Sequence, residues 1–211
     1  MIASQTIKAR NAHCLFHRKF DALKFSSTLR KKFFTVCLTE VPFTQLRHLA
    51  AEIKGRRIKL KPYGLVFLKS SLLKKGASPA IYLNAKGTKL REYLIKQFDE
   101  HFKTRSKYIE LSDEFHDADS IIAYYSLINV ISSTYDFSWE REWRISGDHK
   151  FEFKNLFAII AEEPEAFLEL CQKKLSKQAY NQVRYIPIVS LQWNAERIIE
   201  ELSRKLWESK P

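Results

Sequence analysis

Residues 139–145 carry the densest group of side chains capable of acid–base or electrostatic chemistry, in the order W-E-R-E-W-R-I. We expect a strand here, and side chains alternate between the faces of a strand, so Glu140, Glu142 and Arg144 would share one face. The two carboxylates would lie about 7 Å apart. Each raises the pKa of the other unless a cation lies between them, and Arg144 is placed to supply it. The alternative is an edge strand whose charged face is a solvated salt-bridge ladder.

Two further groups of polar residues precede this segment. Thr39 and Glu40 follow an apolar run and come before Pro42, which is expected to open a helix. Either side chain could cap that helix, or both could line a cleft at a strand end, where small ligands often bind. His13 and His17 would lie about 13 Å apart on a strand, too far to share a zinc ion. His17, at a strand end, is suited to bind a sugar hydroxyl.

An acidic stretch at residues 110–119 stands out in a basic chain. Together with Glu140 and Glu142, its carboxylates could hold Mg²⁺, as in a nuclease, because hard cations prefer oxygen ligands. The alternative is a loop whose acidic residues cap helices.

The three cysteines are widely spaced without a C-x-x-C pair, so they indicate free buried thiols in a reducing compartment, with neither disulfides nor a zinc site.

The 211 residues carry a net charge of +12, concentrated in one half. Residues 1–110 contain 24 Lys and Arg against 7 Asp and Glu, whereas residues 111–211 contain 12 against 17. This split favours contact with a polyanion, either nucleic acid or a dinucleotide, over a generally solvated surface. No apolar run is long enough to span a bilayer and no signal peptide is indicated, so we expect a cytoplasmic protein without membrane contact. The chain has no phosphate-binding glycine loop, so arginines, aromatic rings and backbone amides would have to hold any nucleotide.

Short strands and amphipathic helices are mixed without strict alternation, which predicts an α+β fold with a central mixed sheet flanked by helices. We expect one domain over residues 1–211, with a core at 13–190 and a C-terminal helix within 191–211. Expected strands are 14–16, 33–38, 56–61, 65–68, 80–83, 139–145, 156–160 and 184–189. Expected helices are 19–29, one from Pro42, 70–75, 89–102, 164–175 and 194–207. Residues 121–131 suit either helix or buried strand.

Three blocks, taken in order, carry a resemblance to a known family. They are T-V-C-L-T-E-V-P at 35–42, Y-G-L-V-F at 63–67 with K-G-A-S-P-A-I-Y at 75–82, and W-E-R-E-W-R-I at 139–145. Over residues 13–190 the chain resembles the AbiGi-type abortive-phage-infection proteins and a related bacterial family with an E-x-E-W-R strand. This resemblance implies a bacterial phage-defence or toxin–antitoxin component.

The layout is also distantly similar to ADP-ribosyltransferases, including the DarT-type enzymes that modify DNA. That resemblance implies that Glu142 is the catalytic glutamate, which grips a ribose hydroxyl of NAD, and that Glu140 orients the acceptor. It also implies a ribose contact for His17 and stacking of Tyr63 or Tyr82 on nicotinamide. Arg144 and Thr39 complete the implied cofactor site.

Three functions therefore stay open at this point. The first is an ADP-ribosyltransferase-like toxin or phage-defence effector that uses NAD, with nucleic acid as a candidate acceptor. The second is a non-enzymatic component that binds nucleic acid or a partner protein, such as a cognate antitoxin, and the transferase-like domain would then be degenerate. The third is a metal-dependent nuclease.

Overall fold

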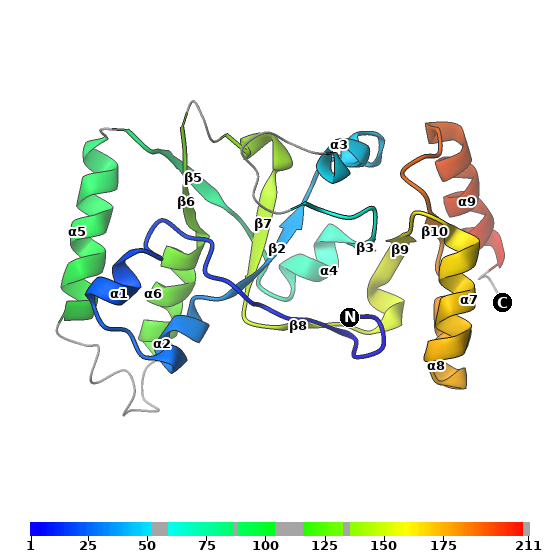
Figure 1. The fold of residues 1–211 in the computed structure, drawn as a ribbon, viewed down its shortest axis with the longest axis horizontal. Coiled ribbons are helices and arrows are strands. Elements are labelled where there is room, and N and C mark those ends of the chain that lie inside the picture. The colour runs from blue at the N-terminus through cyan, green and yellow to red at the C-terminus, as the bar shows by residue number, and fades with distance from the viewer. Residues whose placement is uncertain (52–58, 87, 104–115, 133–135, 209–211) are drawn as a thin grey trace. The chain divides into compact units, whose positions relative to one another are not determined.

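The structure is a computed structural model, in which the chain falls into two compact units (Figure 1). Unit 1 comprises Met1–Thr6, Val41–Lys75 and Lys150–Pro211, and unit 2 comprises Ile7–Glu40 and Gly76–His149. Helices and strands occur in both units, which confirms the α+β class. The residues that the structure describes are 1–51, 59–86, 88–103, 116–132 and 136–208.

Unit 2 contains two of the sheets. Strands β2 (Thr35–Thr39), β7 (Glu142–Ser146) and β4 (Ser78–Pro79) form an antiparallel sheet with β7 in the centre. Strands β5 (Ile81–Asn84) and β6 (Ile128–Ile131) pair in parallel. Alternating side chains give the antiparallel sheet two distinct faces, because residues paired directly across two strands point to the same side.

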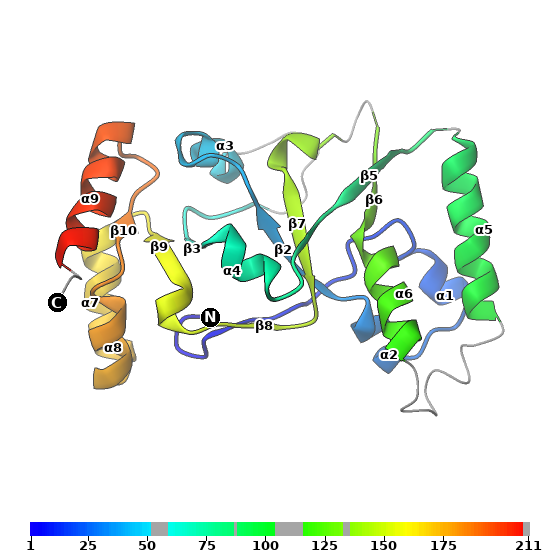
Figure 2. The same cartoon turned by 180° about the vertical axis from the view of Figure 1, so that it is seen from behind.

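Aromatic residues form the core of unit 2, between helices that lie together in both views (Figures 1 and 2). Helix α5 (Lys89–Lys103) presents Phe98 and Phe102 at four-residue spacing, so both rings lie on its buried face. Phe98 stacks on Phe16, with ring centroids 4.4 Å apart and planes 9° apart, and Tyr125 meets both rings edge-on. The other helices of unit 2 are α1 (Lys19–Ala22), α2 (Ser27–Lys32) and α6 (His116–Leu127).

Unit 1 contains a three-stranded sheet in which β9 (Leu156–Ile160) is central. It pairs in parallel with β10 (Ile188–Val189) and antiparallel with β3 (Gly64–Phe67). Ile160, Val189 and Ile198 form a buried cluster that joins this sheet to the last helix. The helical elements of unit 1 are η1 (Phe43–Gln45), α3 (Leu46–Ala50), α4 (Lys69–Leu73), η3 (Phe153–Asn155), α7 (Pro164–Lys174), α8 (Lys177–Val183) and α9 (Ala195–Glu208).

Most long or strongly apolar segments are predicted correctly. The expected helices at 89–102, 164–175 and 194–207 and the strand at 156–160 agree with α5, α7, α9 and β9 within two residues. The helix expected at 70–75 is α4, and Gly76 follows it with φ +80°. Residues 121–131 contain both predicted alternatives, since α6 ends at Leu127 and β6 begins at Ile128.

Other local predictions are wrong. Residues 14–16 form a turn, in which the His17 amide donates to the Cys14 carbonyl, and no strand. The helix expected at 19–29 is divided into α1 and α2 because Lys24 adopts φ +54°, which is incompatible with a continuous right-handed helix. The strand expected at 184–189 is reduced to β10, because the C-cap Arg184 of α8 and the turn that follows it occupy the first part of that range. Of the strand expected at 56–61, residues 56–58 lie outside the described residues, and residues 59–61 form no strand.

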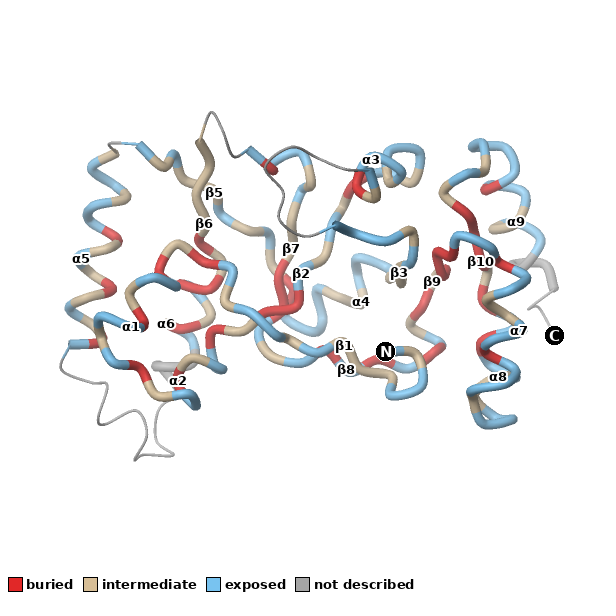
Figure 3. The backbone as a smooth tube through the Cα atoms, in the orientation of Figure 1, coloured by how far each residue is buried: buried red, intermediate tan, exposed pale blue. Residues whose placement is uncertain are grey.

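Over the described residues the strands form four small sheets, the last pairing β1 (Thr6–Ile7) with β8 (His149–Lys150). The expected central mixed sheet is thus divided among several smaller ones. Two of these sheets have buried central parts: the middle of β7 is buried in one, and most of β9 and β10 in another (Figure 3). None of the helices in the described ranges combines the length and apolar character that crossing a lipid bilayer requires.

Candidate functional site

The segment expected to be one strand at 139–145 divides at Arg141. Helix η2 (Ser138–Glu140) comes first, Arg141 adopts a left-handed conformation with φ +48°, and β7 then begins at Glu142. The Thr39 hydroxyl donates to the Glu140 carbonyl, and the Glu40 amide donates to the Arg141 carbonyl at 3.2 Å, which hold this turn against the end of β2. Glu140 therefore lies on η2 and not on the strand face that carries Glu142.

The register of β2 and β7 defines a polar sheet face. Thr39 lies opposite Glu142, and Cys37 lies opposite Arg144. Directly paired residues share a face, so these four side chains lie on the same side of the sheet, which we call the carboxylate face. The sequence alternation predicted that Glu142 and Arg144 would lie together, and this part of the prediction is confirmed by their direct hydrogen bonds.

The Glu142 carboxylate is the centre of a hydrogen-bond network on the carboxylate face. Arg144 binds it in bidentate fashion, with Nε 3.0 Å from Oε1 and Nη2 3.0 Å from Oε2. The Tyr82 hydroxyl, from β5, donates to Oε2 at 2.6 Å. Arg144 Nη1 donates at 2.6 Å to the carbonyl of Ser126, near the end of α6. One ion pair thus joins β7, β5 and α6.

This ion pair is withdrawn from solvent. Arg144 is 1% exposed, and the Glu142 side chain is 13% exposed. A buried charge is tolerated only when it is paired and hydrogen-bonded, and the bidentate geometry with the Ser126 carbonyl meets that condition. The remaining exposed part of Glu142 leaves its carboxylate accessible to a ligand.

The network determines the protonation states of its members. Burial acts to raise the pKa of Glu142, but the Arg144 hydrogen bonds and charge, aided by Tyr82, outweigh it and hold that pKa below the usual 4.5. Burial and the Glu142 carboxylate raise the pKa of the Tyr82 phenol far above its usual 10. At neutral pH Glu142 is therefore ionised and Tyr82 is a hydrogen-bond donor.

Cys37 lies at the same carboxylate. The residue is exposed as a whole, yet the loss of solvent around its sulfur and the Glu142 charge raise the pKa of the thiol to about 12. Its Sγ lies 3.8 Å from the Thr35 hydroxyl. Because thiolate is the reactive form, Cys37 is a poor nucleophile at neutral pH. The sequence offered no signal for this placement beyond the alternation of β2.

The two histidines of the N-terminal segment differ in their surroundings. His17 is exposed, and its Nδ1 lies 3.0 Å from the Cys14 carbonyl. His13 is also exposed, and it lies within electrostatic reach of Arg144, Glu142 and His17. Loss of solvent around its ring and the Arg144 charge lower the pKa of His13 below 6.5, although Glu142 acts in the opposite direction. The titration of His13 is thus coupled to the Glu142–Arg144 pair.

The opposite face of the same sheet carries a second polar cluster. Trp143 Nε1 donates to Glu40 Oε2 at 3.0 Å, and Arg141 Nη2 lies 3.3 Å from the same oxygen. The Glu40 carboxylate therefore binds two side chains of the η2–β7 turn and does not cap the helix after Pro42. This cluster supports the turn that begins β7.

The structure brings some of the predicted site residues together and leaves others elsewhere. Glu142, Arg144 and Tyr82 are in direct contact, and Thr39 pairs across the sheet from Glu142. Tyr63 belongs to unit 1, where it is 56% exposed. Stacking of Tyr63 on a nicotinamide at this carboxylate stays a prediction.

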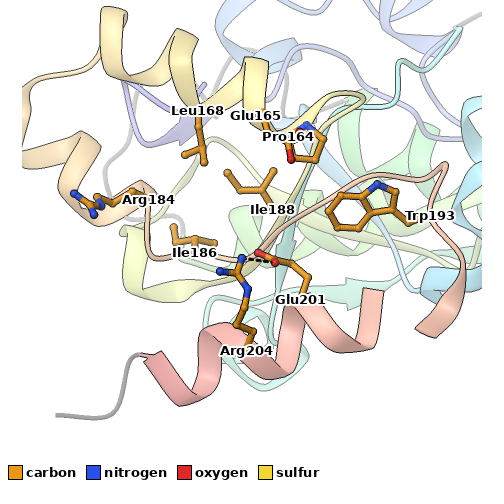
Figure 4. Close-up of a pocket in the computed structure, with 9 residues that line it drawn as sticks. All are labelled: Pro164, Glu165, Leu168, Arg184, Ile186, Ile188, Trp193, Glu201 and Arg204. Carbon is orange, nitrogen blue, oxygen red and sulfur yellow. Dashed lines mark hydrogen bonds and ion pairs between the residues drawn. The ribbon is translucent and has the colours of Figure 1, made fainter. Parts of the chain in front are cut away.

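Unit 1 has a small cavity of its own, with a volume of about 100 Å³ (Figure 4). Ile186 and Ile188 lie in its apolar part, and the Arg204–Glu201 ion pair, at 2.6 Å, lies beside them. Trp193 borders it from the far side. The cavity contains none of the residues that the sequence pattern singled out.

The acidic stretch at 110–119 lies mostly outside the described residues, and this includes Asp113. Among the residues that are described, no group of three or more His, Cys, Asp and Glu side chains is arranged to hold a metal ion. The side chains of Asp117 and Asp119 are also not described, so the metal-dependent nuclease alternative stays a prediction.

In comparisons with known proteins, no protein-family model, no curated protein and no solved structure matches the chain. The protein is therefore classified by its fold and by the side-chain chemistry of its site. The chain is an α+β protein with an ionised, partly accessible glutamate held by a buried arginine and a tyrosine.

Proposed function

We propose that the chain is an ADP-ribosyltransferase-like effector of a bacterial phage-defence or toxin system, with NAD as substrate and nucleic acid as a candidate acceptor. One observation carries this proposal: the Glu142 carboxylate is ionised at neutral pH, held in one orientation by Arg144 and Tyr82, and close to the exposed His13. A fixed negative charge of this kind stabilises positive charge that develops at a sugar carbon.

The donor set around Glu142 fits a ribose hydroxyl. A carboxylate offers about four acceptor positions, of which Arg144 and Tyr82 use three. The Cys37 thiol nearby is a weak donor, so a hydroxyl can compete for the remaining position. NAD, when bound, supplies the ADP-ribosyl group and nicotinamide as the leaving group.

Each residue of the network has its own part in this proposal. Glu142 accepts a hydroxyl proton in a hydrogen bond and places its charge beside the reacting carbon. Arg144 and Tyr82 are positioning residues, because together they fix both carboxylate oxygens through hydrogen bonds. Glu140, on η2, lies within electrostatic reach of Tyr82. Its part in the proposal is to orient the acceptor.

The test is release of nicotinamide from labelled NAD in the presence of DNA, RNA or cell lysate. We expect turnover by the unaltered protein and a loss of at least about 100-fold in Glu142→Gln, the usual scale for removing a charge-stabilising group. Glu40→Gln is the matched control, since it makes the same chemical change on the opposite face of the sheet and should retain activity. Urea unfolding of both variants separates lost catalysis from lost folding. Absence of NAD cleavage with every acceptor would rule the proposal out.

A different observation favours a second candidate function, a non-enzymatic component that binds nucleic acid or a partner such as a cognate antitoxin. The Glu142–Arg144 pair ties β7 to β5 and α6, which is sufficient reason for its presence without catalysis. The net charge of +12 supplies attraction to a polyanion. On this alternative, the cellular effect of the protein persists in Glu142→Gln at a temperature where that variant is folded.

A further inference from the structure

His13 is anchored on both sides by strands that flank the carboxylate network. The Thr35 amide, at the start of β2, donates to the Asn11 carbonyl at 3.3 Å. The Leu15 amide donates to the carbonyl of Ile128, the first residue of β6, at 2.8 Å. The chain from residue 11 to residue 15 therefore crosses from β2 to β6.

Arg144 also links the region of β2 to the start of β6. It lies on β7 beside β2, and its Nη1 reaches the Ser126 carbonyl, two residues before Ile128. The Arg144 charge acts on His13 and also on the next residue, Cys14, which is buried while His13 is exposed. The backbone thus places the His13 imidazole at the surface, within electrostatic reach of the Glu142–Arg144 pair.

From this placement we infer that His13, and not His17, is the general base of the site, which accepts the proton of the attacking acceptor group. This role rests on the proposed function. The acceptor X–H forms a bond from X to the ribose carbon, and the bond from that carbon to the nicotinamide nitrogen breaks with its electron pair. The acceptor proton moves to His13, which then releases it to water. The products are ADP-ribosyl acceptor, nicotinamide and one proton.

The charges around His13 agree with this role. Glu142 and Arg144 of β7 face it, and His17 lies on the following turn. Loss of solvent, aided by Arg144 and His17 and opposed by Glu142, lowers the pKa of His13, so the ring is neutral at neutral pH and can accept a proton. Glu142 then stabilises the imidazolium that forms. His17 holds its Nδ1 against the Cys14 carbonyl instead.

The first arm of the test is a proton NMR titration of the protein without NAD. Glu142→Gln removes the carboxylate that raises the pKa of His13, so we expect the His13 pKa to fall further. Glu40→Gln, on the opposite sheet face, should leave it unchanged. If the His13 pKa is the same in Glu142→Gln and in the unaltered protein, His13 does not lie near Glu142, and this conclusion is independent of any activity on NAD.

The second arm compares NAD cleavage by His13→Ala and His17→Ala. We expect His13→Ala to lose about 10²–10⁴-fold in rate, the range for removal of a general base, and to recover part of it with added imidazole. His17→Ala removes no general base under this inference, so added imidazole should not change its rate. The same response to imidazole in both variants would overturn the inference while the proposed function stands. If the unaltered protein does not cleave NAD, the proposed function fails and the catalytic role of His13 fails with it, and the NMR arm still decides its placement.

Discussion

Arg144 places a full positive charge inside unit 2, and its surroundings explain how that charge is tolerated. The guanidinium donates twice to Glu142 and once to the Ser126 carbonyl. Transfer of an ion pair from water into a protein costs several kcal/mol per ion, which good geometry largely offsets. The pair therefore contributes little as a unit, whereas loss of either partner leaves an uncompensated buried group.

Arg144→Met should accordingly destabilise the protein by about 3–5 kcal/mol, because Glu142 loses its cation but stays buried. Arg141→Met is the matched control, since Arg141 pairs with Glu40 at an exposed position, where an ion pair contributes about 0–1 kcal/mol. Urea unfolding measures both. If the two variants unfold at the same urea concentration, the buried pair does not have the role assigned to it.

Acid should weaken the fold through Glu142. Its folded-state pKa is depressed, so its stabilising effect is complete above the usual value of 4.5 and is lost as pH falls through the folded-state pKa. The free energy of unfolding of the unaltered protein should therefore approach that of Glu142→Gln as pH decreases from neutral to about 3. Urea titrations across this range give the difference at each pH. A constant difference would show that the Glu142 pKa is not depressed.

At the scale of elements, the start of β7 is the feature with the largest effect on the site. A continuous strand from residue 139 would have put Glu140 and Glu142 on one face, as the alternation predicted. The left-handed conformation of Arg141 ends that alternation, and contacts from Thr39 at the end of β2 and from the following Glu40 hold it. Residues distant in sequence thus decide which carboxylate joins Arg144.

Helix α2 offers a test of a local stabilising contact in unit 2. Ser26 is its N-cap, and the Ser26 hydroxyl accepts from the Leu29 amide at 3.2 Å. Ser26→Ala should destabilise the protein by about 1 kcal/mol, because a helix-end amide loses its partner. Ser27→Ala, one residue into the same helix and exposed, should change stability by less than about 0.5 kcal/mol. Thermal and urea unfolding compare them. Equal effects would mean that the cap is not formed in solution.

At the scale of the whole molecule, the net charge of +12 predicts electrostatic binding to nucleic acid. If six or more phosphates are engaged, affinity for single-stranded DNA should fall by roughly 10³-fold between about 50 and 200 mM salt. Fluorescence anisotropy at several salt concentrations measures the slope. A neutral polymer of similar length is the control. Affinity that does not depend on salt would exclude polyanion attraction as the basis of binding.

The local sequence pattern was sufficient to predict some of the elements of this protein. The apolar spacing of α5, α7 and α9 and the apolar run of β9 determined those elements, since an amphipathic period or a buried run has one favourable structure. The alternation of residues 142–145 also placed Glu142 beside Arg144, because side chains two apart on a strand share a face.

Tertiary structure alone decided what surrounds that pair. Tyr82, the Ser126 carbonyl, Cys37 and His13 come from four other segments, and no periodicity in the chain relates them to residue 142. The same is true of the division of the strands into several sheets and of the break at Arg141. Pairing between distant segments depends on register and on the burial of whole faces, which are properties of the packed chain and not of any one segment.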